Sequence, residues 1–568
     1  MKVTVKGKGD VTLTQQDFVA EGGQGKVFAK NGVAYKVYHK PKDMIPAGKI
    51  AELASLPIPL FSRPHDLLLD PKSHNTIGYT TKFVDDAYVL VQLFPRSFRD
   101  REGLTHKHTF RLAEIMRDGF TVAHKSGILL IDPNEMNFLV DSKFTGLTFI
   151  DTDSYQTRSY PATAIMDSVR DRHMAHKMAF TEGTDWFSFA CVAFQMLVGI
   201  HPYKGKHPDK ALKQMDARMQ ANISVLHKDV RVPASVYPFD VIPANWRSWF
   251  EAVLDRGERV PPPGGVLTVA IIKPVIRAIT GSGNLTLEEM GSFDGSVTGV
   301  WSNGMHLVVA TDKSLWMDGH KVSSHGKTSV VGFSPKMGVP VAVEHSVDIP
   351  VLTHCVTRAP VPFGLNAQRL AGADGRVYLK SRDKVLEMAF ADVGNSVIAS
   401  TRTVASVLPN ASLLFPGGVV QNMLGSAFVS IFSKGRSHQI RMKELDDYRI
   451  LGGKYDEGDK GGVLMFVGVK KGQTDRLVFR FDDTFSTYDL RTVADVLSSD
   501  LNFIVTDAGV CVLLDETNDC LELISVRKGS TQMKTITDNL IGGDMRLFKS
   551  GAQVLVARGD KVYQMRMK

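Results

Sequence analysis

The chain has 568 residues, which is too long for one hydrophobic core, so we expect at least two domains. Its composition of 43% hydrophobic and 23% charged residues is typical of folded globular proteins and excludes a largely disordered chain. The formal net charge of +8 is spread along the sequence, and no basic run alternates with aromatic residues. We therefore expect no nucleic-acid partner.

Apolar runs and cysteines predict the compartment. No apolar run approaches the ~18 residues that a membrane span needs, and the N-terminal stretch MKVTVKGKGDVTL lacks a signal-peptide core. The four cysteines are scattered, without a CxxC pair or metal-ligand spacing, which fits reduced thiols. The sequence thus predicts a cytoplasmic protein without a membrane partner.

The first motif is a strand, a glycine-rich turn and a returning strand over residues 18–29. Asn31-Gly32 then predicts a two-residue hairpin turn, and a third strand over residues 33–38 carries Lys36 at its middle. Glycines let backbone amides approach phosphates, and a lysine on the adjoining strand can reach them. The motif predicts a nucleotide site; the alternative is a glycine-containing hairpin with a solvated lysine.

The second motif lies within residues 127–155. Asp132 is followed after four residues by Asn137, and two short apolar strands joined by a polar turn lead to Asp151. Phosphoryl transfer needs a carboxylate that receives a hydroxyl proton, and an amide and a carboxylate that hold a divalent cation against the phosphates. The alternative is a polar hairpin between buried strands.

Together and in this order, the two motifs resemble the glycine-rich, catalytic and metal-binding loops of the protein kinase fold. The resemblance implies that Asp132 is the catalytic base, that Lys36 holds the phosphates of ATP, and that Asn137 and Asp151 bind Mg²⁺ or Mn²⁺. Ala20 stands where the family has its first glycine. The nucleotide-binding residues that the resemblance implies are Ala20, Gly22, Gly23, Gly25, Val27, Ala34, Lys36, Glu52, Lys82 and Val84.

Further predicted elements follow the order of elements in the protein kinase fold. A helix expected over residues 47–56 carries Glu52, which is its sole carboxylate and either pairs with Lys36 or lies in solvent. Strands are expected over residues 66–69 and 76–83, with an adenine-binding hinge at residues 81–84. A helix over residues 105–126 ends near His124, which we expect to be a packed, hydrogen-bonded residue.

The expected C-terminal lobe of this domain is helical. A strongly apolar helix over residues 184–198 carries Asp185, which by resemblance braces the backbone of the catalytic loop. Helices over residues 209–221 and 244–254 complete the lobe, and the proline-glycine run at residues 261–265 ends it. We therefore expect an N-terminal α+β, bilobal kinase-like domain over residues 1–264.

Three departures qualify the resemblance. Leu130 and Ile131 replace the usual His-Arg before the base, and Asn134 stands where most serine/threonine kinases have a lysine. The metal-binding triplet is Asp151-Thr152-Asp153, without a glycine. This combination resembles the atypical serine/threonine protein kinase-like proteins of bacteria and phages.

Residues 265–568 differ from the preceding residues in their pattern of apolar and polar runs. Short apolar runs alternate with polar hairpin tips, and the hairpins recur roughly every 40 to 47 residues, as in the four-stranded blades of a β-propeller. We expect an all-β domain, a propeller of six or seven blades or alternatively a pair of β-sandwiches, in which a strand over residues 269–279 closes the ring. No catalytic pattern stands out here, so this domain is expected to bind a protein substrate or partner.

Two functions compete. The first is an ATP-dependent serine/threonine protein kinase whose β-propeller recruits the substrate. The second is a pseudokinase, a nucleotide-binding scaffold whose propeller mediates protein interactions. The presence of Lys36, Asp132, Asn137 and Asp151 together favours the kinase, because a scaffold has no physical need for all four.

Overall fold

The computed structural model describes residues 1–162, 165–174, 179–263, 283, 285–324, 329–346, 349–394 and 396–567. The chain forms two compact units. Unit 1 comprises Met1–Pro95 and Leu104–Pro274, and unit 2 comprises Arg96–Gly103 and Val275–Lys568. The expected boundary at residues 264 and 265 and the strand expected over residues 269–279 lie outside the described residues.

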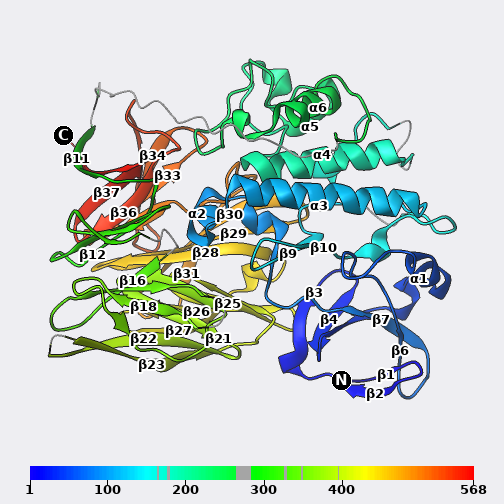
Figure 1. Cartoon of the computed structure of the whole chain (residues 1–568), viewed down its shortest axis with the longest axis horizontal. Coiled ribbons are helices and arrows are strands. Elements are labelled where there is room, and N and C mark those ends of the chain that lie inside the picture. Colours follow the sequence, from blue (N-terminus) through cyan, green and yellow to red (C-terminus); the bar gives the residue numbers. More distant parts are fainter. Residues whose placement is uncertain are drawn as a thin grey trace. The chain divides into compact units, whose positions relative to one another are not determined.

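Unit 1 contains a seven-stranded antiparallel sheet with the order β2-β1-β6-β7-β5-β4-β3 (Figure 1). The turn between β4 and β5 has left-handed backbone at Asn31 (φ 51°) and Gly32 (φ 75°), which confirms the predicted two-residue hairpin. The strands are β1 Lys2–Val5, β2 Gly9–Thr12, β3 Phe18–Glu21, β4 Gly25–Lys30, β5 Val33–Tyr38, β6 Leu67–Leu69 and β7 Thr76–Lys82.

A second sheet in unit 1 has three strands in the order β10-β9-β8, and five α-helices are described in the same unit. The strands are β8 Ala87–Val89, β9 Phe138–Asp141 and β10 Leu147–Phe149. The α-helices are α1 Ala47–Leu53, α3 His106–Lys125, α4 Glu182–Val198, α5 Met215–Ala221 and α6 Ala244–Leu254. Short 3-10 turns lie at η1 Gln15–Asp17, η2 Pro41–Asp43, η3 Leu90–Leu93, η4 Thr152–Ser154, η5 Asp167–Val169, η6 Lys210–Leu212 and η7 Phe239–Val241.

The predicted helices of unit 1 are present with altered ends. The helix expected over residues 47–56 ends at Leu53, and the one expected over residues 209–221 is an α-helix only from Met215, after the separate turn η6. α4 begins at Glu182, before the expected residue 184, because the side chain of Thr181 accepts a hydrogen bond from the amide of Thr184 and caps it. It ends at Gly199, whose φ of 85° suits glycine.

An aromatic core positions the strand that leads to Asp151. α3 and α4 lie side by side (Figure 1), and Phe149 at the end of β10 is fully buried. Its ring centroid lies 4.6 Å from that of Phe61 and 5.0 Å from that of Phe138. Gly119 allows α3 to approach this ring, since a Cβ there would lie 2.3 Å from a ring carbon of Phe149.

In the residues that the structure describes, unit 2 is all-β apart from one α-helix and one 3-10 turn, and its strands form seven four-stranded antiparallel sheets. The first strand, β11, hydrogen-bonds with the last, β38, so both ends of the long segment share one sheet.

The strands of unit 2 are β11 Leu285–Ser292, β12 Val297–Ser302, β13 Leu307–Thr311, β14 Leu315–Met317, β15 His320–Ser323, β16 Ser329–Phe333, β17 Pro340–Glu344, β18 Val351–His354, β19 Pro360–Val361, β20 Arg369–Ala373, β21 Arg376–Ser381, β22 Lys384–Val393, β23 Ser396–Ser406, β24 Ser412–Phe415, β25 Gly418–Met423, β26 Ser426–Ser433, β27 Arg436–Arg441, β28 Arg449–Gly458, β29 Gly461–Lys470, β30 Gln473–Phe481, β31 Tyr488–Val493, β32 Phe503–Val505, β33 Val510–Asp515, β34 Cys520–Ser525, β35 Met533–Thr537, β36 Arg546–Ser550, β37 Gln553–Arg558 and β38 Lys561–Met567, with a 3-10 turn η8 at Lys443–Leu445.

The helix of unit 2 is α2, Arg96–Glu102, which comes from the middle of the sequence of unit 1. The backbone amide of Ser97 donates a hydrogen bond to Asp500 at 3.2 Å, and Asp100 forms an ion pair with Arg546. The sequence placed this segment in the N-terminal domain. Unit 2 therefore requires a helix that lies outside the expected domain 265–568.

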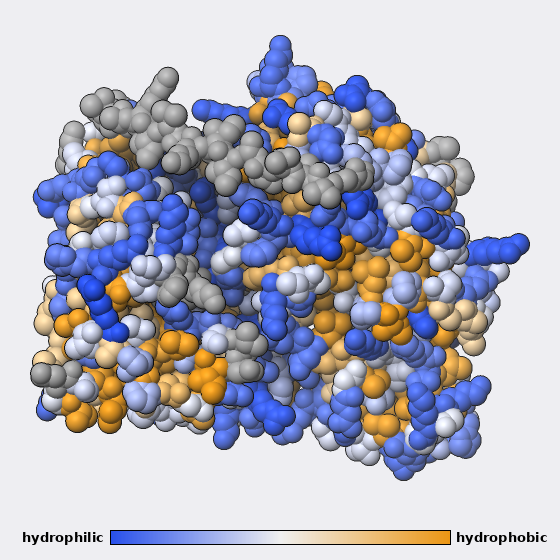
Figure 2. Space-filling view, in the orientation of Figure 1, coloured by the Kyte–Doolittle hydropathy of each residue, from blue (hydrophilic) through white to orange (hydrophobic). Residues whose placement is uncertain are grey.

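The surface of the molecule is mixed in character. Figure 2 shows apolar residues gathering at the lower left of the view, where Figure 1 draws the sheets β16–β19 and β20–β23 of unit 2. No helix in the described part of the chain combines the length and the apolarity that a bilayer crossing requires.

We predict that Gly119→Ala destabilises the protein. Alanine favours a helix over glycine by about 1 kcal/mol, but its methyl group would overlap the buried ring of Phe149, and overpacking costs about 1–3 kcal/mol. The melting temperature of the full chain should fall, while Lys107→Ala, an exposed change on the same helix, should leave it nearly unchanged. An unchanged melting temperature for Gly119→Ala would contradict the close packing of α3 on β10.

Candidate functional site

The centre of the site is a buried ion pair between Lys36 on β5 and Asp153 in η4. The Nζ of Lys36 lies 2.7 Å from Oδ2 of Asp153 and 3.2 Å from Oδ1 of Asp151. The side chain of Lys36 is 13% exposed and that of Asp153 is 5% exposed. The structure thus brings together two segments that are 117 positions apart in the sequence.

Two tyrosines complete the surroundings of this ion pair. The hydroxyl of Tyr38 donates a hydrogen bond of 2.8 Å to Oδ2 of Asp153, and the ammonium of Lys36 lies 5.6 Å and 5.8 Å from the ring centroids of Tyr38 and Tyr79. Burial raises the pKa of both tyrosines, and the charge of Asp153 raises it further. Both hydroxyls therefore stay protonated and can donate.

Electrostatics hold both members of the pair in their charged forms. Burial disfavours the charge of Lys36, but the carboxylates of Asp153 and Asp151 outweigh burial and raise its pKa. Burial likewise opposes the charge of Asp153, but Lys36 and Tyr38 stabilise the carboxylate and lower its pKa. An ammonium held in place by a buried carboxylate has fixed geometry and keeps donors for a third partner.

Asp151 lies beside the pair but faces solvent. Its side chain is 57% exposed, and its backbone is left-handed with φ 56°, which aspartate tolerates better than most residues. It directly precedes the turn η4, whose fold turns Asp153 inward. The two carboxylates therefore differ in role: Asp153 is enclosed with Lys36, whereas Asp151 is available to a ligand.

The loop from Asp132 to Asn137 holds the second acidic group of the site. The side-chain amide of Asn137 donates a hydrogen bond of 2.8 Å to the backbone carbonyl of Asp132, which leaves the amide oxygen of Asn137 free to accept. Burial raises the pKa of Asp132, and Asp151 adds to that effect, although hydrogen bonds from Asn134 and Met166 act against it. Desolvation makes this carboxylate a better proton acceptor than a solvated aspartate.

The backbone of the loop before Asp132 is strained, and hydrogen bonds to Asp185 hold it in place. Ile131 is a buried β-branched residue with φ 66°, a conformation that such residues rarely adopt. Asp185 at the start of α4 accepts hydrogen bonds from the amides of Leu130 at 2.8 Å and Ile131 at 2.9 Å, and from Nε2 of His124 at 2.9 Å. This bracing by Asp185 and the packed state of His124 were both predicted from the sequence.

The glycine turn is compact at one end and open at the other. The amide of Gly22 donates to the carbonyl of Gly25 at 2.9 Å. A Cβ at Gly25 would lie 2.3 Å from the carbonyl oxygen of Val37, so glycine is required there. A Cβ at Gly22 or Gly23 would meet nothing within 4 Å, so these two glycines leave room for a ligand.

The other expected nucleotide contacts lie on the same sheet or next to it. Ala20 lies opposite Val27 in the β3–β4 pair, Val27 lies opposite Lys36 in the β4–β5 pair, and Ala34 is buried in β5. At the expected hinge, the carbonyl of Lys82 accepts a hydrogen bond of 2.7 Å from Ser62, which occupies one of its lone pairs. Val84 is the second residue after β7.

Of the two alternatives for Glu52, pairing with Lys36 or lying in solvent, the pairing with Lys36 is wrong. Glu52 does not pair with Lys36, because its Oε2 accepts a hydrogen bond of 3.1 Å from the amide of Ser159. The direct partner of Lys36 is Asp153 instead. The sequence contained a signal for it, since Asp153 stands two residues after Asp151, but no role was assigned to it.

Asn137 and Asp151 fit a divalent metal ion. They offer an amide oxygen and an exposed carboxylate, which are the hard ligands that Mg²⁺ and Mn²⁺ prefer. A second group, His207, His227 and Asp229, has its candidate ligand atoms within 4.8 Å of one another. The Nδ1 atoms of both histidines accept backbone amides, which places the proton of the neutral ring on Nε2, so we assign no metal to this group.

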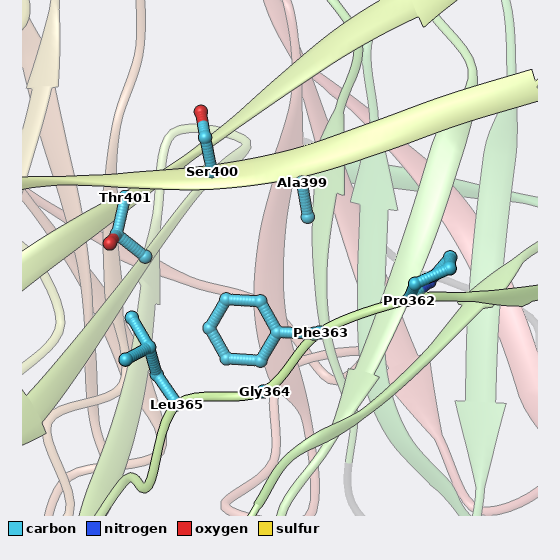
Figure 3. Close-up of a pocket in the computed structure, with 7 residues that line it drawn as sticks. All are labelled: Pro362, Phe363, Gly364, Leu365, Ala399, Ser400 and Thr401. Atoms are coloured by element: carbon cyan, nitrogen blue, oxygen red, sulfur yellow. The ribbon is translucent and has the colours of Figure 1, made fainter.

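A surface hollow in unit 2 has fewer groups that could take part in a reaction. Its volume is about 470 Å³, and Figure 3 shows the ring of Phe363 between Leu365 and the edge strand β23. Its lining residues include no charged side chain, and the hydroxyls of Ser400 and Thr401 have no base among them to activate them. Its lining residues are Pro362, Phe363, Gly364, Leu365, Ala399, Ser400 and Thr401.

No protein-family model and no curated protein matches this chain. The function must therefore be argued from the chemistry of the groups around Lys36. These are a fixed ammonium beside a glycine turn, a pair of oxygen ligands suited to a divalent metal, and a desolvated carboxylate.

We predict that Asp185→Ala is among the most damaging single changes in unit 1. It leaves the buried amides of Leu130 and Ile131 without acceptors, at about 1–3 kcal/mol each, and it releases the strained backbone of Ile131. Amide exchange at residues 130–132 should become faster and the melting temperature of the full chain should fall. Asp240→Ala, an exposed carboxylate change in the same unit, should alter neither; equal exchange in both variants would refute the clamp.

Proposed function

We propose that the chain is an ATP-dependent protein kinase of the atypical serine/threonine kind, with unit 1 as the catalytic domain. The observation that carries the proposal is the ion pair of Lys36 with Asp153, which fixes an ammonium with one spare donor beside the exposed carboxylate of Asp151, on the strand next to the one that follows the open glycine turn. A polyphosphate bound by lysine and glycine amides requires this arrangement.

Each group has a role in this proposal. Lys36 binds oxygens of the α and β phosphates, and the amide of Gly23 approaches them from the turn, in which the amide of Gly22 donates to the carbonyl of Gly25. Asn137 and Asp151 hold the divalent cation, which when bound neutralises charge on the phosphates. Asp132 accepts the proton of the attacking hydroxyl, and its raised pKa suits a base.

A second function is favoured by a specific contact. Oδ1 of Asp132 accepts a hydrogen bond of 2.9 Å from the backbone amide of Met166, so one oxygen of the proposed base is occupied. In a nucleotide-binding scaffold without phosphoryl transfer, this contact would be permanent. In a kinase the substrate hydroxyl would approach the other oxygen, Oδ2, or take the place of this amide.

For unit 2 we propose a seven-bladed β-propeller that binds a protein substrate or partner. Its four-stranded sheets and the pairing of β11 with β38 support a closed ring. Contacts between the strands β12, β36, β32, β28, β24, β20 and β16, each with the next in this order, also support it. A kinase cleft reads only a few residues around the accepting hydroxyl, so a separate docking surface adds selectivity.

Binding of Mg-ATP is the first requirement of the proposal. Millimolar Mg-ATP should raise the melting temperature of the full chain, because a ligand that binds only the folded state stabilises it by mass action. Asp151→Asn should remove the metal-dependent part of the shift. Asp167→Asn, an exposed carboxylate change in unit 1, should leave the shift intact, whereas no shift in the wild type would refute the nucleotide site.

Phosphoryl transfer separates the kinase from the scaffold. With γ-labelled ATP and Mg²⁺ or Mn²⁺, Asp132→Asn should lower label transfer to protein by about 10²- to 10⁴-fold, which is the usual contribution of a positioned base. ATP binding by this variant should remain close to that of the wild type. Equal labelling of the two proteins, at the level of a heat-inactivated sample, would favour the scaffold.

A further inference from the structure

The strand β23 in unit 2 has one edge without a strand partner. Its sheet has the order β20-β21-β22-β23, so within the described residues β23 pairs with β22 alone. With 11 residues it is longer than any other terminal strand of the seven sheets. In an antiparallel pair, alternate residues direct their N–H and C=O groups away from the partner strand. β23 therefore presents a long row of backbone donors and acceptors to a further strand.

This edge lacks most of the charge that keeps other sheet edges apart. Natural proteins protect edge strands by making them short or by placing charged side chains on them. β23 carries a single charged residue, Arg402, whose guanidinium donates a hydrogen bond of 2.6 Å to Glu387 on β22. The preceding part of the strand, Ser396–Thr401, is uncharged. The corresponding strands of the other sheets are all shorter, and each is either two residues long or charged: β11, β15, β19, β27, β31 and β35.

The outward face of the β22–β23 hairpin is also uncharged. The alternate residues Phe390 and Val397 are buried in the core of the sheet, which leaves their neighbours in the strands to face solvent. Val393 is 54% exposed and Ile398 is 53% exposed. Three cross-strand pairs on this face consist of exposed, uncharged residues: Ala389 with Ser400, Ala391 with Ile398, and Val393 with Ser396. Exposed apolar residues gathered beside an open edge mark an interaction surface.

The charge of the edge determines which strand can cover it. Pairing through the backbone needs a second extended strand with a free edge, and like charges opposite each other oppose the pairing. A second copy of β23 meets both conditions. With a two-fold axis at Ala399, Ile398 would lie opposite Ser400 of the copy, and Arg402 would lie opposite Ser396 of the copy. No two like charges would then meet, so the edge is complementary to itself.

We propose that two copies of the chain associate through β23, with the two strands antiparallel across a two-fold axis. The sheets β20–β23 of the two copies would form one continuous sheet through the interface. The backbone groups along each edge gain partners, and Ile398 of each copy is covered by the other. The hollow beside residues 399–401 shows that the strand is open to a neighbour there (Figure 3). The proposal depends neither on the proposed kinase activity nor on closure of the ring of sheets.

Sedimentation equilibrium of the full chain over a range of concentrations tests the interface. The wild type should be a dimer in equilibrium with the monomer. Ile398→Lys places a charge on the shared edge of both copies and should raise the dissociation constant of the dimer at least about tenfold. Met290→Lys, the same kind of change at an exposed apolar residue of the terminal strand β11, should leave it unchanged. A wild type that is monomeric at every concentration, or an equally stable dimer of Ile398→Lys, would overturn the inference.

Amide exchange tests whether β23 itself is the contact. The outward-directed amides within residues 397–403 should exchange more slowly where the dimer is populated than where the monomer is, because they donate to the copy. Ile398→Lys should remove this difference, and Met290→Lys should keep it. Dimerisation without slower exchange at β23 would place the contact elsewhere and overturn the inference. Ser400→Lys, at another exposed position of the edge, replaces Ile398→Lys if that variant does not reach the wild-type melting temperature.

Discussion

The buried ion pair of Lys36 and Asp153 is the interaction on which unit 1 depends. It joins the middle of the seven-stranded sheet to the turn that follows the three-stranded sheet, and neither partner is left in solvent. A buried ion pair costs desolvation free energy on both sides, so it is weak grounds for stability in itself. Its value lies in geometry, because the pair fixes where the ammonium is and which carboxylate remains open.

A buried carboxylate also fixes the geometry at Ile131, whose backbone is strained. A β-branched residue in the left-handed region is unfavourable, and it persists because Asp185 accepts both neighbouring amides from a fully buried position. α4 is buried along nearly its whole length, so the clamp does not move with solvent-exposed segments. The rigid core therefore holds the loop of Asp132 in a shape that its own sequence would not prefer.

Much of this arrangement could be predicted from the sequence. The hairpin at Asn31-Gly32 followed from local turn chemistry, the packed state of His124 was expected from the sequence, and the role of Asp185 was implied by the resemblance to the protein kinase fold. The partner of Lys36 could not be predicted, because Glu52 and Asp153 both lie within plausible reach in sequence terms. The choice depends on how α1 packs, since Glu52 on this helix accepts a hydrogen bond from the amide of Ser159.

In unit 2, the periodicity of apolar residues predicted the strands but not the helix α2. Apolar runs predicted short repeated strands, and the described residues contain them in seven sheets. The inclusion of α2 had no periodic signal, because its link to the sheets consists of single polar contacts such as Ser97 with Asp500. Contacts of that kind depend on residues some 400 positions away in the sequence, which no local pattern encodes.

Because α2 belongs to unit 2, a single cut in the chain does not separate the two units. The chain passes from unit 1 into unit 2 at residue 96, returns at residue 104, and enters unit 2 again further on. Cutting the chain once between the two long segments would leave α2 noncovalently held. Recombination that exchanged unit 2 for another domain would leave α2 without its buried partners, so the two units are constrained to change together.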